Sequence, residues 1–376
     1  MKPDLRCRLS TTCLLLLGFM VPAAVWAADM HDDTIRITLS TGLFGVQITA
    51  RMYAPDGNGP FPLVVINHGK AEGNPHFQAD KGYYLQAREF VKRGYAVLVP
   101  TRQGYGTSGG GYRHAACNAT KTGELQADDI ESAIKYAKTL PYIDGNRIVV
   151  IGQSVGGLAT MALGERHIPG VLGLIDMAGG IRMDNCAAWE QSDIDAFTQY
   201  GQQSRTPALL MYGDNDTYWG PTLPKQMFDA YIAAGGKATF IDYGTFENDS
   251  HNTFPHPAGK PLWLPAFTKF FTSLGLPFDE KYDLHSDAPG GDVAQIDAVP
   301  YLSRGSKIIY AEFLDSDPRG HRAFALSPDG HSGYAVGPNA EQQALALCAK
   351  HTQMHCTLYA VDQKVVYQTD SVAAQP

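Results

Sequence analysis

Short apolar runs alternate with amphipathic stretches along most of the chain, from about Thr34 to Leu276. The runs are aliphatic or β-branched on both faces, which is typical of parallel strands that helices cover on both sides. Two earlier segments alternate apolar and polar residues instead, as antiparallel strands with one exposed face do. The pattern predicts an antiparallel entry at 34–39 and 46–53, followed by buried strands at 63–67, 96–100, 148–152, 171–176, 208–212 and 238–243.

Amphipathic segments occupy the intervals between the buried runs. They predict helices at 83–92, 124–139, 155–165, 223–234 and 265–274. Right-handed crossovers would place these helices on the two faces of one sheet. The predicted fold class is therefore α/β, with a mostly parallel sheet flanked by helices.

The chain changes character after the last of these helices. Residues 286–300 are rich in Asp, Gly, Pro and Ala and show little periodicity, which is typical of a linker. Beyond the linker, the pattern predicts strands at 307–313, 322–326, 357–361 and 365–367, and a helix at 341–350. We therefore expect residues 301–376 to form a small α+β module, and nothing in it identifies a protein partner.

The N-terminus has the pattern of an export signal. Basic residues come first, an apolar run follows at 14–25, and Val25, Trp26 and Ala27 carry small side chains at the outer two positions. This order predicts a signal peptide at 1–27, cleaved near Ala27, and a catalytic domain at 28–285. An uncleaved anchor is the alternative, but a spanning helix needs about 20 apolar residues. We expect a periplasmic or secreted protein without stable membrane insertion.

The formal net charge of −8 becomes −10 when residues 1–27 are removed, because that segment carries three basic residues and one acidic residue. A mildly acidic chain without basic clusters argues against nucleic acid or an anionic membrane as a partner. The charge pattern identifies no partner beyond that.

The strongest chemical signal is a GxSxG pentapeptide, from Gly152 to Gly156, between a predicted strand and a predicted helix. In that context the motif is a nucleophile elbow, whose turn is too tight for side chains larger than glycine on either side of the serine. Ser154 would stand at the N-terminus of a helix, where the dipole favours a developing negative charge. The alternative is a serine that merely caps the helix.

A serine hydroxyl needs a base to take its proton and a third group to orient that base. After such an elbow, the order along the chain is nucleophile, acid, base. Asp214 and Asp216 follow the strand predicted at 208–212, and His251 lies after the next strand, with His256 close behind. The order alone does not decide between the two aspartates as the acid, or between the two histidines as the base.

Further motifs extend the elbow into a family resemblance. They are Asn67, His68 and Gly69 after one strand, Arg102, Gly104, Gly106 and Ser108 after the next, and the run from Gly152 to Gly157. With them, residues 34–276 resemble the dienelactone-hydrolase-like branch of the α/β hydrolases, which implies the α/β-hydrolase fold. Dienelactone hydrolases proper use a cysteine nucleophile, so Ser154 favours a serine esterase or peptidase of related architecture.

The resemblance also selects among the candidate residues. It implies Asp216 rather than Asp214 as the acid, and His251 rather than His256 as the base.

An oxyanion hole needs two backbone donors, of which the elbow predicts the Val155 amide. The resemblance implies the second donor at Lys70. His68, by contrast, is expected to pack or form hydrogen bonds rather than to catalyse.

The sequence offers little evidence of a cofactor or metal site. Gly104, Gly106 and Gly109 match GxGxxG after a strand, but no helix pattern follows, as a dinucleotide site requires. The chain contains neither GxxxxGK[ST] nor HExxH. We expect no metal and no organic cofactor.

Four cysteines follow the signal segment, and an even count in an oxidising compartment predicts two disulfides. We expect Cys348 to pair with Cys356 and, by elimination, Cys117 with Cys186, although the sequence does not fix the pairing. The alternative for the tail is a zinc site of Cys348, His351, His355 and Cys356, because zinc prefers thiolate and imidazole ligands.

Residues 179–206 lie where α/β hydrolases place a cap over the site. Aromatic residues in and after this segment are candidates to line the substrate pocket or to fill the core: Trp189, Phe197, Tyr200, Tyr218 and Trp219.

The sequence therefore predicts a serine hydrolase that cleaves a carboxylic ester of a small-molecule acyl substrate. A serine peptidase is the alternative within hydrolases. A non-catalytic envelope-binding protein on the same scaffold is the alternative from another class.

Overall fold

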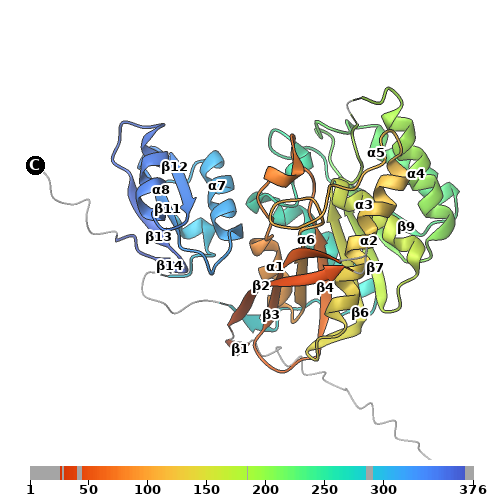
Figure 1. The fold of residues 1–376 in the computed structure, drawn as a ribbon, viewed down its shortest axis with the longest axis horizontal. Helices are drawn as coiled ribbons and strands as arrows, with labels where there is room; N and C mark the ends of the chain where they lie inside the picture. The colour runs from red at the N-terminus through yellow and green to blue at the C-terminus, as the bar shows by residue number, and fades with distance from the viewer. Residues whose placement is uncertain (1–25, 28, 40–44, 184, 285–290, 369–376) are drawn as a thin grey trace, which may run out of the picture.

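The computed structural model describes residues 26–27, 29–39, 45–183, 185–284 and 291–368 (Figure 1). Its centre is a sheet built from β2 (Met30–Leu39), β3 (Val46–Pro55), β4 (Phe61–Asn67), β5 (Ala96–Pro100), β6 (Ile143–Gln153), β7 (Val171–Met177), β8 (Ala208–Tyr212) and β9 (Ala238–Asp242). The strand order is β2-β3-β5-β4-β6-β7-β8-β9. Strand β3 pairs antiparallel with both β2 and β5. All other neighbouring pairs, from β5–β4 to β8–β9, are parallel.

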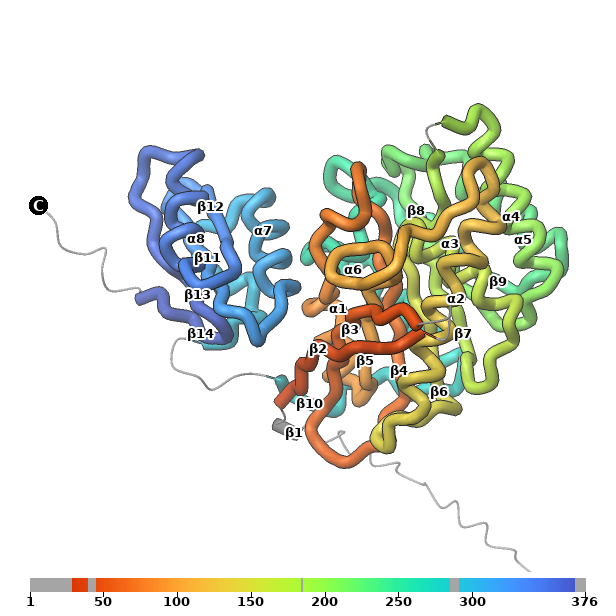
Figure 2. The backbone as a smooth tube through the Cα atoms, viewed as in Figure 1, coloured from red at the N-terminus to blue at the C-terminus, as the bar shows by residue number. Residues whose placement is uncertain are grey.

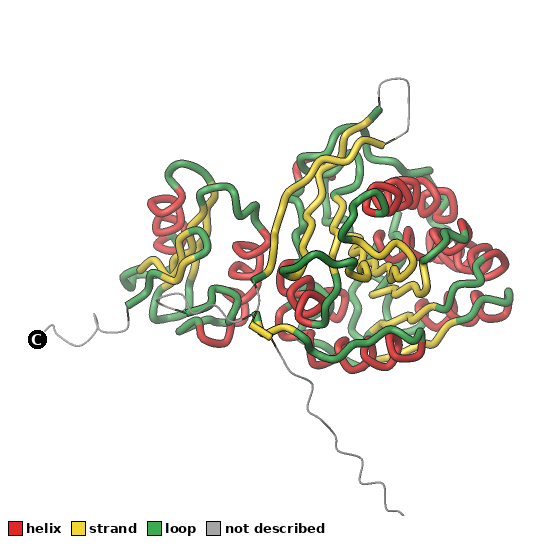
Figure 3. Tube along the Cα trace, turned by 90° about the horizontal axis from the view of Figure 1, so that it is seen from below, coloured by secondary structure: helices red, strands yellow, loops and turns green. Residues whose placement is uncertain are grey.

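Helices cover both faces of this sheet (Figure 3). They are α1 (Tyr84–Lys92), α2 (Ala119–Ala137), α3 (Val155–Leu163), α4 (Trp189–Gln203), α5 (Leu223–Ala233) and α6 (Lys260–Ser273). α2, α3, α4 and α5 bury their apolar residues in one core cluster, and α1 and α6 bury theirs in a second cluster on the opposite face. The predicted α/β class is confirmed, and each strand and helix predicted between 34 and 276 is present with ends shifted by a few residues.

Helix α4 was not predicted, and it corrects the expectation of a cap at 179–206. It connects β7 to β8 and packs against α2 and α5, so it belongs to the helical layer. Its buried residues, Asp193, Ala196, Phe197, Tyr200 and Gly201, recur at helical spacing, but they include few aliphatic side chains. Phe197 and Tyr200 are fully buried and fill the core.

The C-terminal module consists of α7 (Arg304–Asp315), β11 (Arg322–Leu326), β12 (Ser332–Val336), α8 (Ala340–Ala349), β13 (Thr357–Val361) and β14 (Lys364–Val365). The strands form an antiparallel sheet in the order β12-β11-β13-β14. Figure 2 shows the module in blue, beside the α1 edge of the catalytic domain. The expected α+β character is confirmed, while the predicted domain boundaries stay predictions.

The strand predicted at 307–313 is wrong, because this segment lies within α7. Short apolar runs fit a helix as well as a strand, and the isoleucines at 308 and 309 favoured the strand. Ser303 settles the local structure, since its hydroxyl accepts a hydrogen bond from the Ser306 amide and caps the helix. Strand β12 was missed because its small residues give no clear alternation. A Cβ on Gly333 would lie 2.7 Å from the Cys348 amide nitrogen of α8.

The module shares an apolar cluster with the catalytic domain. Tyr310, Phe313 and Phe324 lie in the same buried cluster as residues of α1 and α6. Asp315 at the end of α7 accepts a hydrogen bond from the Tyr84 amide at 2.8 Å, and so caps the N-terminus of α1. The module is therefore packed onto the catalytic domain through apolar and polar contacts.

Part of the predicted linker is packed as well. Asp292, Val293 and Val299 are buried, and Asp292 pairs with Arg88 of α1, whereas 285–290 lie outside the described residues. Because 291–300 contact the core, they do not form a free linker.

The remaining short elements are β1 (Trp26–Ala27), β10 (Tyr282–Asp283) and the 3₁₀ turns η1 (Pro75–Phe77), η2 (Gly164–Arg166), η3 (Ser250–Asn252), η4 (Pro257–Gly259) and η5 (Ile296–Ala298). The predicted signal peptide lies outside the described residues, except that residues 26 and 27 pair with β10. Among the described residues, no helix is long and apolar enough to cross a bilayer.

Both expected disulfides, Cys117–Cys186 and Cys348–Cys356, are present. The second one uses both thiols that the alternative zinc site would need as thiolates, so that alternative is wrong.

Candidate active site

The turn between β6 and α3 has the geometry of a nucleophile elbow. Ser154 adopts a φ of 57° and a ψ of −125°, a conformation that L-residues rarely take. A Cβ on Gly152 would collide with the Gly156 carbonyl oxygen, and a Cβ on Gly156 would collide with the Asn67 carbonyl oxygen. Ser154 precedes α3, yet its side chain makes no capping hydrogen bond. The capping alternative therefore finds no support.

The loop after β4 lies directly against the elbow. Strands β4 and β6 are neighbours in the sheet, although β5 lies between them in the sequence. The strand order therefore reverses at this pair, and ligands of open α/β sheets bind at the carboxyl ends of the strands at such a switch point. A Cβ on Gly69 would lie 3.0 Å from the Cβ of Ser154. The first amides of α3 have no acceptor within the helix, so the Val155 N–H is suited to an anion. The Lys70 side chain turns to the Ala71 carbonyl oxygen at 3.1 Å, and the role of its amide stays a prediction.

His68 holds this loop in place, as a hydrogen-bonding residue would. Its Nε2 accepts the Arg102 amide at 3.2 Å, so Nδ1 carries the proton and donates to the Gly69 carbonyl oxygen at 2.7 Å. Burial lowers the pKa of His68 well below its ordinary value, and the Arg102 charge lowers it further. The ring is therefore neutral and fixed in one tautomer.

A second histidine pairs with an aspartate beyond β8 and β9. His251 Nδ1 lies 3.0 Å from Asp216 Oδ2, and the Asp216 side chain is fully buried. Asp216 Oδ1 accepts the amides of Tyr218 at 2.8 Å and Trp219 at 3.1 Å. Asp214 is exposed instead, and the nearby negative charge of Asp242 raises its pKa. The structure thus brings Asp216, not Asp214, to His251.

His256 lies elsewhere. Its Nδ1 accepts the Ala258 amide at 3.1 Å, and its ring lines a cleft beside α1 and α6 together with Trp263. It does not contact Asp216 within the described residues, so only His251 has the partner that a catalytic base needs.

Two further residues fix this geometry, and the sequence analysis did not identify them. Asp249 accepts the His251 amide at 3.0 Å, the Thr217 amide at 3.1 Å and the Thr217 hydroxyl at 2.9 Å, so it joins the acid loop to the histidine loop. Gln153 Nε2 donates to the His251 carbonyl oxygen at 3.1 Å and joins that loop to the elbow. An Asp two residues before His251 is a local signal of such a turn.

The elbow and the histidine loop are thus adjacent, and both Ser154 and His251 are nearly buried. Among the described residues, no hydrogen bond joins the Ser154 hydroxyl to His251. Such contacts often tighten only when substrate binds.

The predicted pocket aromatics form one cluster beside His251. The Tyr218 ring lies 4.4 Å from the His251 ring, and the Trp219 ring lies 5.6 Å from it. Trp189 follows, with its ring 5.9 Å from that of Trp219. Tyr218 and Trp189 are half-buried, so they have surface that a ligand can contact.

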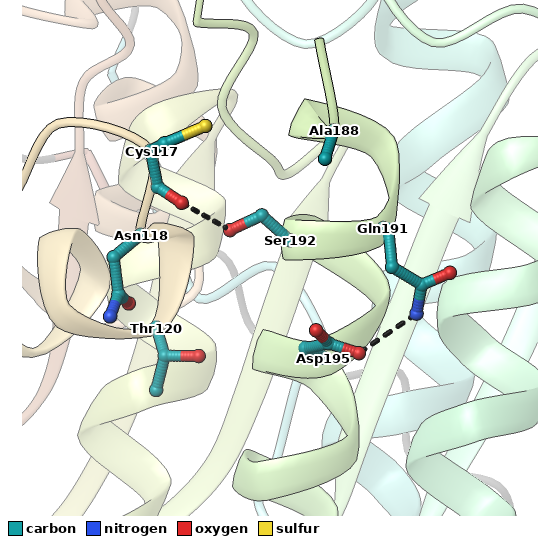
Figure 4. Close-up of a pocket in the computed structure, with 7 residues that line it drawn as sticks. All are labelled: Cys117, Asn118, Thr120, Ala188, Gln191, Ser192 and Asp195. Carbon is teal, nitrogen blue, oxygen red and sulfur yellow. Dashed lines mark hydrogen bonds between the residues drawn. The ribbon is translucent and has the colours of Figure 1, made fainter. Parts of the chain in front are cut away.

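A separate hollow lies between the N-terminal parts of α2 and α4, next to Cys117 (Figure 4). Its lining residues are Cys117, Asn118, Thr120, Ala188, Gln191, Ser192 and Asp195. None of the predicted catalytic or oxyanion residues is among them, so this hollow is not the candidate active site.

A buried carboxyl group below the elbow gives the fold a pH dependence. Burial raises the pKa of Asp176 to about 7, although the Tyr212 hydroxyl donates to it at 2.8 Å. An unfolded aspartate has a pKa of about 3.9, so between these values the folded state binds more protons. Stability contributed by this group is therefore lost as pH rises through that window, by at most about 1.4 kcal/mol per pH unit.

We expect Asp176→Asn to flatten this slope in urea unfolding measured from about pH 5 to pH 8. Asp195→Asn, at an exposed position on α4, should leave the slope as in the wild type. Equal slopes in all three proteins would contradict the assignment.

Comparisons with known proteins agree with this architecture. A model of the prolyl oligopeptidase family matches residues 82–168, from before α1 to beyond the elbow and α3. The chain is 34% identical over 124 residues to the quorum-quenching protein AidA of Acinetobacter baumannii, covering 32% of this chain. The match spans 38% of the length of AidA, and the match to a second curated relative, a dipeptidyl-peptidase 5 of Porphyromonas gingivalis, spans 30% of that protein's length.

Two solved structures are similar in fold. A Bacteroides ovatus protein assigned as a dipeptidyl aminopeptidase IV has a TM-score of 0.50 and 18% identity, over 65% of this chain and 36% of that one. A Klebsiella pneumoniae protein assigned as a dienelactone hydrolase has a TM-score of 0.47 and 16% identity, over 65% of this chain and 99% of that one. With the strand order and the elbow described above, the chain has the α/β-hydrolase fold, and the family match supports an assignment to that superfamily.

Proposed function

We propose that the protein is an exported serine hydrolase that cleaves a carboxylic ester of a small molecule through an acyl-enzyme on Ser154. The observation that carries this proposal is the buried Asp216–His251 pair beside the elbow that presents Ser154. Export is part of the proposal because two disulfides favour an oxidising compartment.

The reaction would proceed in two steps. His251 Nε2 takes the proton from the Ser154 hydroxyl while Oγ attacks the ester carbonyl carbon. The amides of Val155 and Lys70 stabilise the oxyanion, and the imidazolium then protonates the departing alcohol. Water, deprotonated by His251, attacks the carbonyl carbon of the acyl-enzyme. The bond from that carbon to Ser154 Oγ then breaks, the imidazolium returns the proton to Oγ, and the acid is released. Asp216 holds the Nδ1–H tautomer throughout and stabilises the charged ring.

A serine peptidase is the second candidate, and the match to the prolyl oligopeptidase family favours it. The same three side chains serve ester and amide bonds. The two functions are separated by comparing p-nitrophenyl acyl esters with aminoacyl p-nitroanilides. Hydrolysis of amides alone would reverse our preference for an ester.

Labelling with a fluorophosphonate probe tests whether the chain is a serine hydrolase at all. The probe phosphonylates only an activated serine, so we expect stoichiometric labelling of the wild type and none of Ser154→Ala. Ser303→Ala, which removes a helix-capping serine of the C-terminal module, is the control that should still be labelled. An unlabelled but folded wild type would favour a non-catalytic binding protein.

A further inference from the structure

The three aromatic residues beside His251, Tyr218, Trp219 and Trp189, form what we call the aromatic wall. Trp219 anchors it, because its indole nitrogen donates to the Ala178 carbonyl oxygen at 2.8 Å. Gly180 connects the wall to the backbone of Ser154. The Gly180 amide donates to the Ser154 carbonyl oxygen at 3.3 Å, and a Cβ on Gly180 would lie 3.1 Å from the Trp219 ring.

Arg182, two residues after Gly180, stands at the outer end of the wall. Its guanidinium lies 5.6 Å from the centre of the Trp189 ring, and its side chain is exposed. It forms no ion pair with any residue that the structure describes. An arginine stacked on an aromatic ring keeps its hydrogen-bond donors free at the edge of the guanidinium. Within the described part of the chain, Arg182 is therefore an exposed cation without an acidic partner, at the end of the aromatic wall away from His251.

The local charges converge on Tyr218. Burial raises the pKa of Tyr218, the negative charges of Glu72, Asp249 and Asp216 raise it further, and the positive charge of Arg182 lowers it. Glu72 lies in the loop after β4, and Arg182 lies in the loop after β7. Of the two, Arg182 is the one that stacks on the aromatic wall itself.

The backbone that carries Arg182 and Trp189 is held in place. Asp193 of α4 accepts the Ile181 amide at 3.1 Å, and the Cys117–Cys186 disulfide joins the loop to the residues before α2. The Ser192 hydroxyl donates to the Cys117 carbonyl oxygen at 3.2 Å across the same joint (Figure 4). The backbone is therefore tied to the helical layer at residue 181, before Arg182, and at residue 186, before Trp189.

We propose that Arg182 and the aromatic wall select acyl groups that end in a carboxylate, so that the preferred substrates are monoesters of dicarboxylic acids. The aliphatic part of the acyl group would lie along Tyr218 and Trp189, and the terminal carboxylate would bind the guanidinium. Arg182 would act as a specificity-determining residue. This inference rests on the proposed esterase function.

The test compares matched pairs of p-nitrophenyl esters: the monoesters of succinate, glutarate and adipate against the butyrate, valerate and caproate esters. The wild type should prefer the charged member at one chain length or more. Arg182→Gln should lower the charged-to-neutral ratio of kcat/KM about tenfold at that length. The loss should appear mainly as a higher KM for the charged ester, because the carboxylate is bound equally in ground and transition states.

Arg36→Gln is the matched control, since Arg36 is an exposed arginine on edge strand β2 and its loss changes the net charge equally. It should leave the ratio unchanged, and Arg182→Lys should retain part of the preference. The thermal unfolding midpoint of each variant, together with fluorophosphonate labelling of Ser154, reports on whether it is folded.

The inference is overturned if Arg182→Gln keeps the wild-type ratio, or if the wild type prefers neutral or amino-bearing esters at every length. Failure of the proposed function is a different result. In that case the wild type hydrolyses no ester and a fluorophosphonate does not label Ser154.

Discussion

Asp216→Asn is expected to lower kcat for ester hydrolysis about 10⁴-fold while the protein stays folded. The reason is that the two carboxylate oxygens of Asp216 have different hydrogen-bond partners. Oδ1 accepts two backbone amides, those of Tyr218 and Trp219, so the asparagine must keep its carbonyl oxygen there. Its NH₂ group then faces His251 Nδ1, which has to accept that hydrogen bond. The ring proton moves to Nε2, and the imidazole can no longer take the proton of Ser154.

Asp214→Asn is the matched control, because Asp214 lies two residues away and is exposed. Removing its charge should change kcat by no more than about twofold, as surface substitutions usually do. Burst-phase and steady-state rates with a p-nitrophenyl ester, together with the thermal unfolding midpoint, would measure both variants. A severe loss in Asp214→Asn with a mild one in Asp216→Asn would show that the acid is misassigned.

The local part of this site could be predicted from the sequence. The elbow is encoded in five consecutive residues, because Gly152 and Gly156 have no room for a Cβ and the flanking apolar patterns fix a strand before and a helix after. The parallel strands were predictable for a similar reason, since burial on both faces leaves a continuous apolar run. Asp214 and Asp216 could not be separated by pattern alone, because the choice depends on which carboxylate turns inward.

Contacts between distant loops were not predictable in this way. Asp249 and Gln153 connect the acid loop, the histidine loop and the elbow, yet each is an ordinary polar residue in the sequence. The apolar run at 307–313 favoured a strand locally, and a helix forms because Tyr310 and Phe313 then reach the shared core while Asp315 reaches α1. Tertiary packing determines these contacts and the helix at 307–313, and it produces no periodic pattern in the sequence from which they could be predicted.

Arg51→Met is expected to lower the free energy of unfolding by about 3–5 kcal/mol. Arg51 of β3 is nearly buried and pairs with Asp32 of β2, with Nη2 2.6 Å from Oδ2. Its Nη1 donates to the carbonyl oxygens of Asp315 at 3.1 Å and Ser316 at 3.2 Å, at the end of α7. Burial raises the pKa of Asp32 and the Arg51 charge opposes that rise. The variant leaves a buried carboxylate without its partner and removes a cation from a helix C-terminus.

The double variant Arg51→Met/Asp32→Leu separates two ways in which the C-terminal module is held. Replacing both members of a buried ion pair by apolar residues is often neutral, so we expect the double variant to recover most of the lost stability. Arg36→Met, at an exposed position of β2, is the control for removing a positive charge and should cost less than about 0.5 kcal/mol. Urea unfolding followed by fluorescence and circular dichroism would give these values. Recovery would mean that the apolar cluster shared with α1 holds the module and that Arg51 mainly neutralises Asp32. If the double variant stays as unstable as Arg51→Met, the hydrogen bonds from Arg51 to the end of α7 are what join the two parts of the chain.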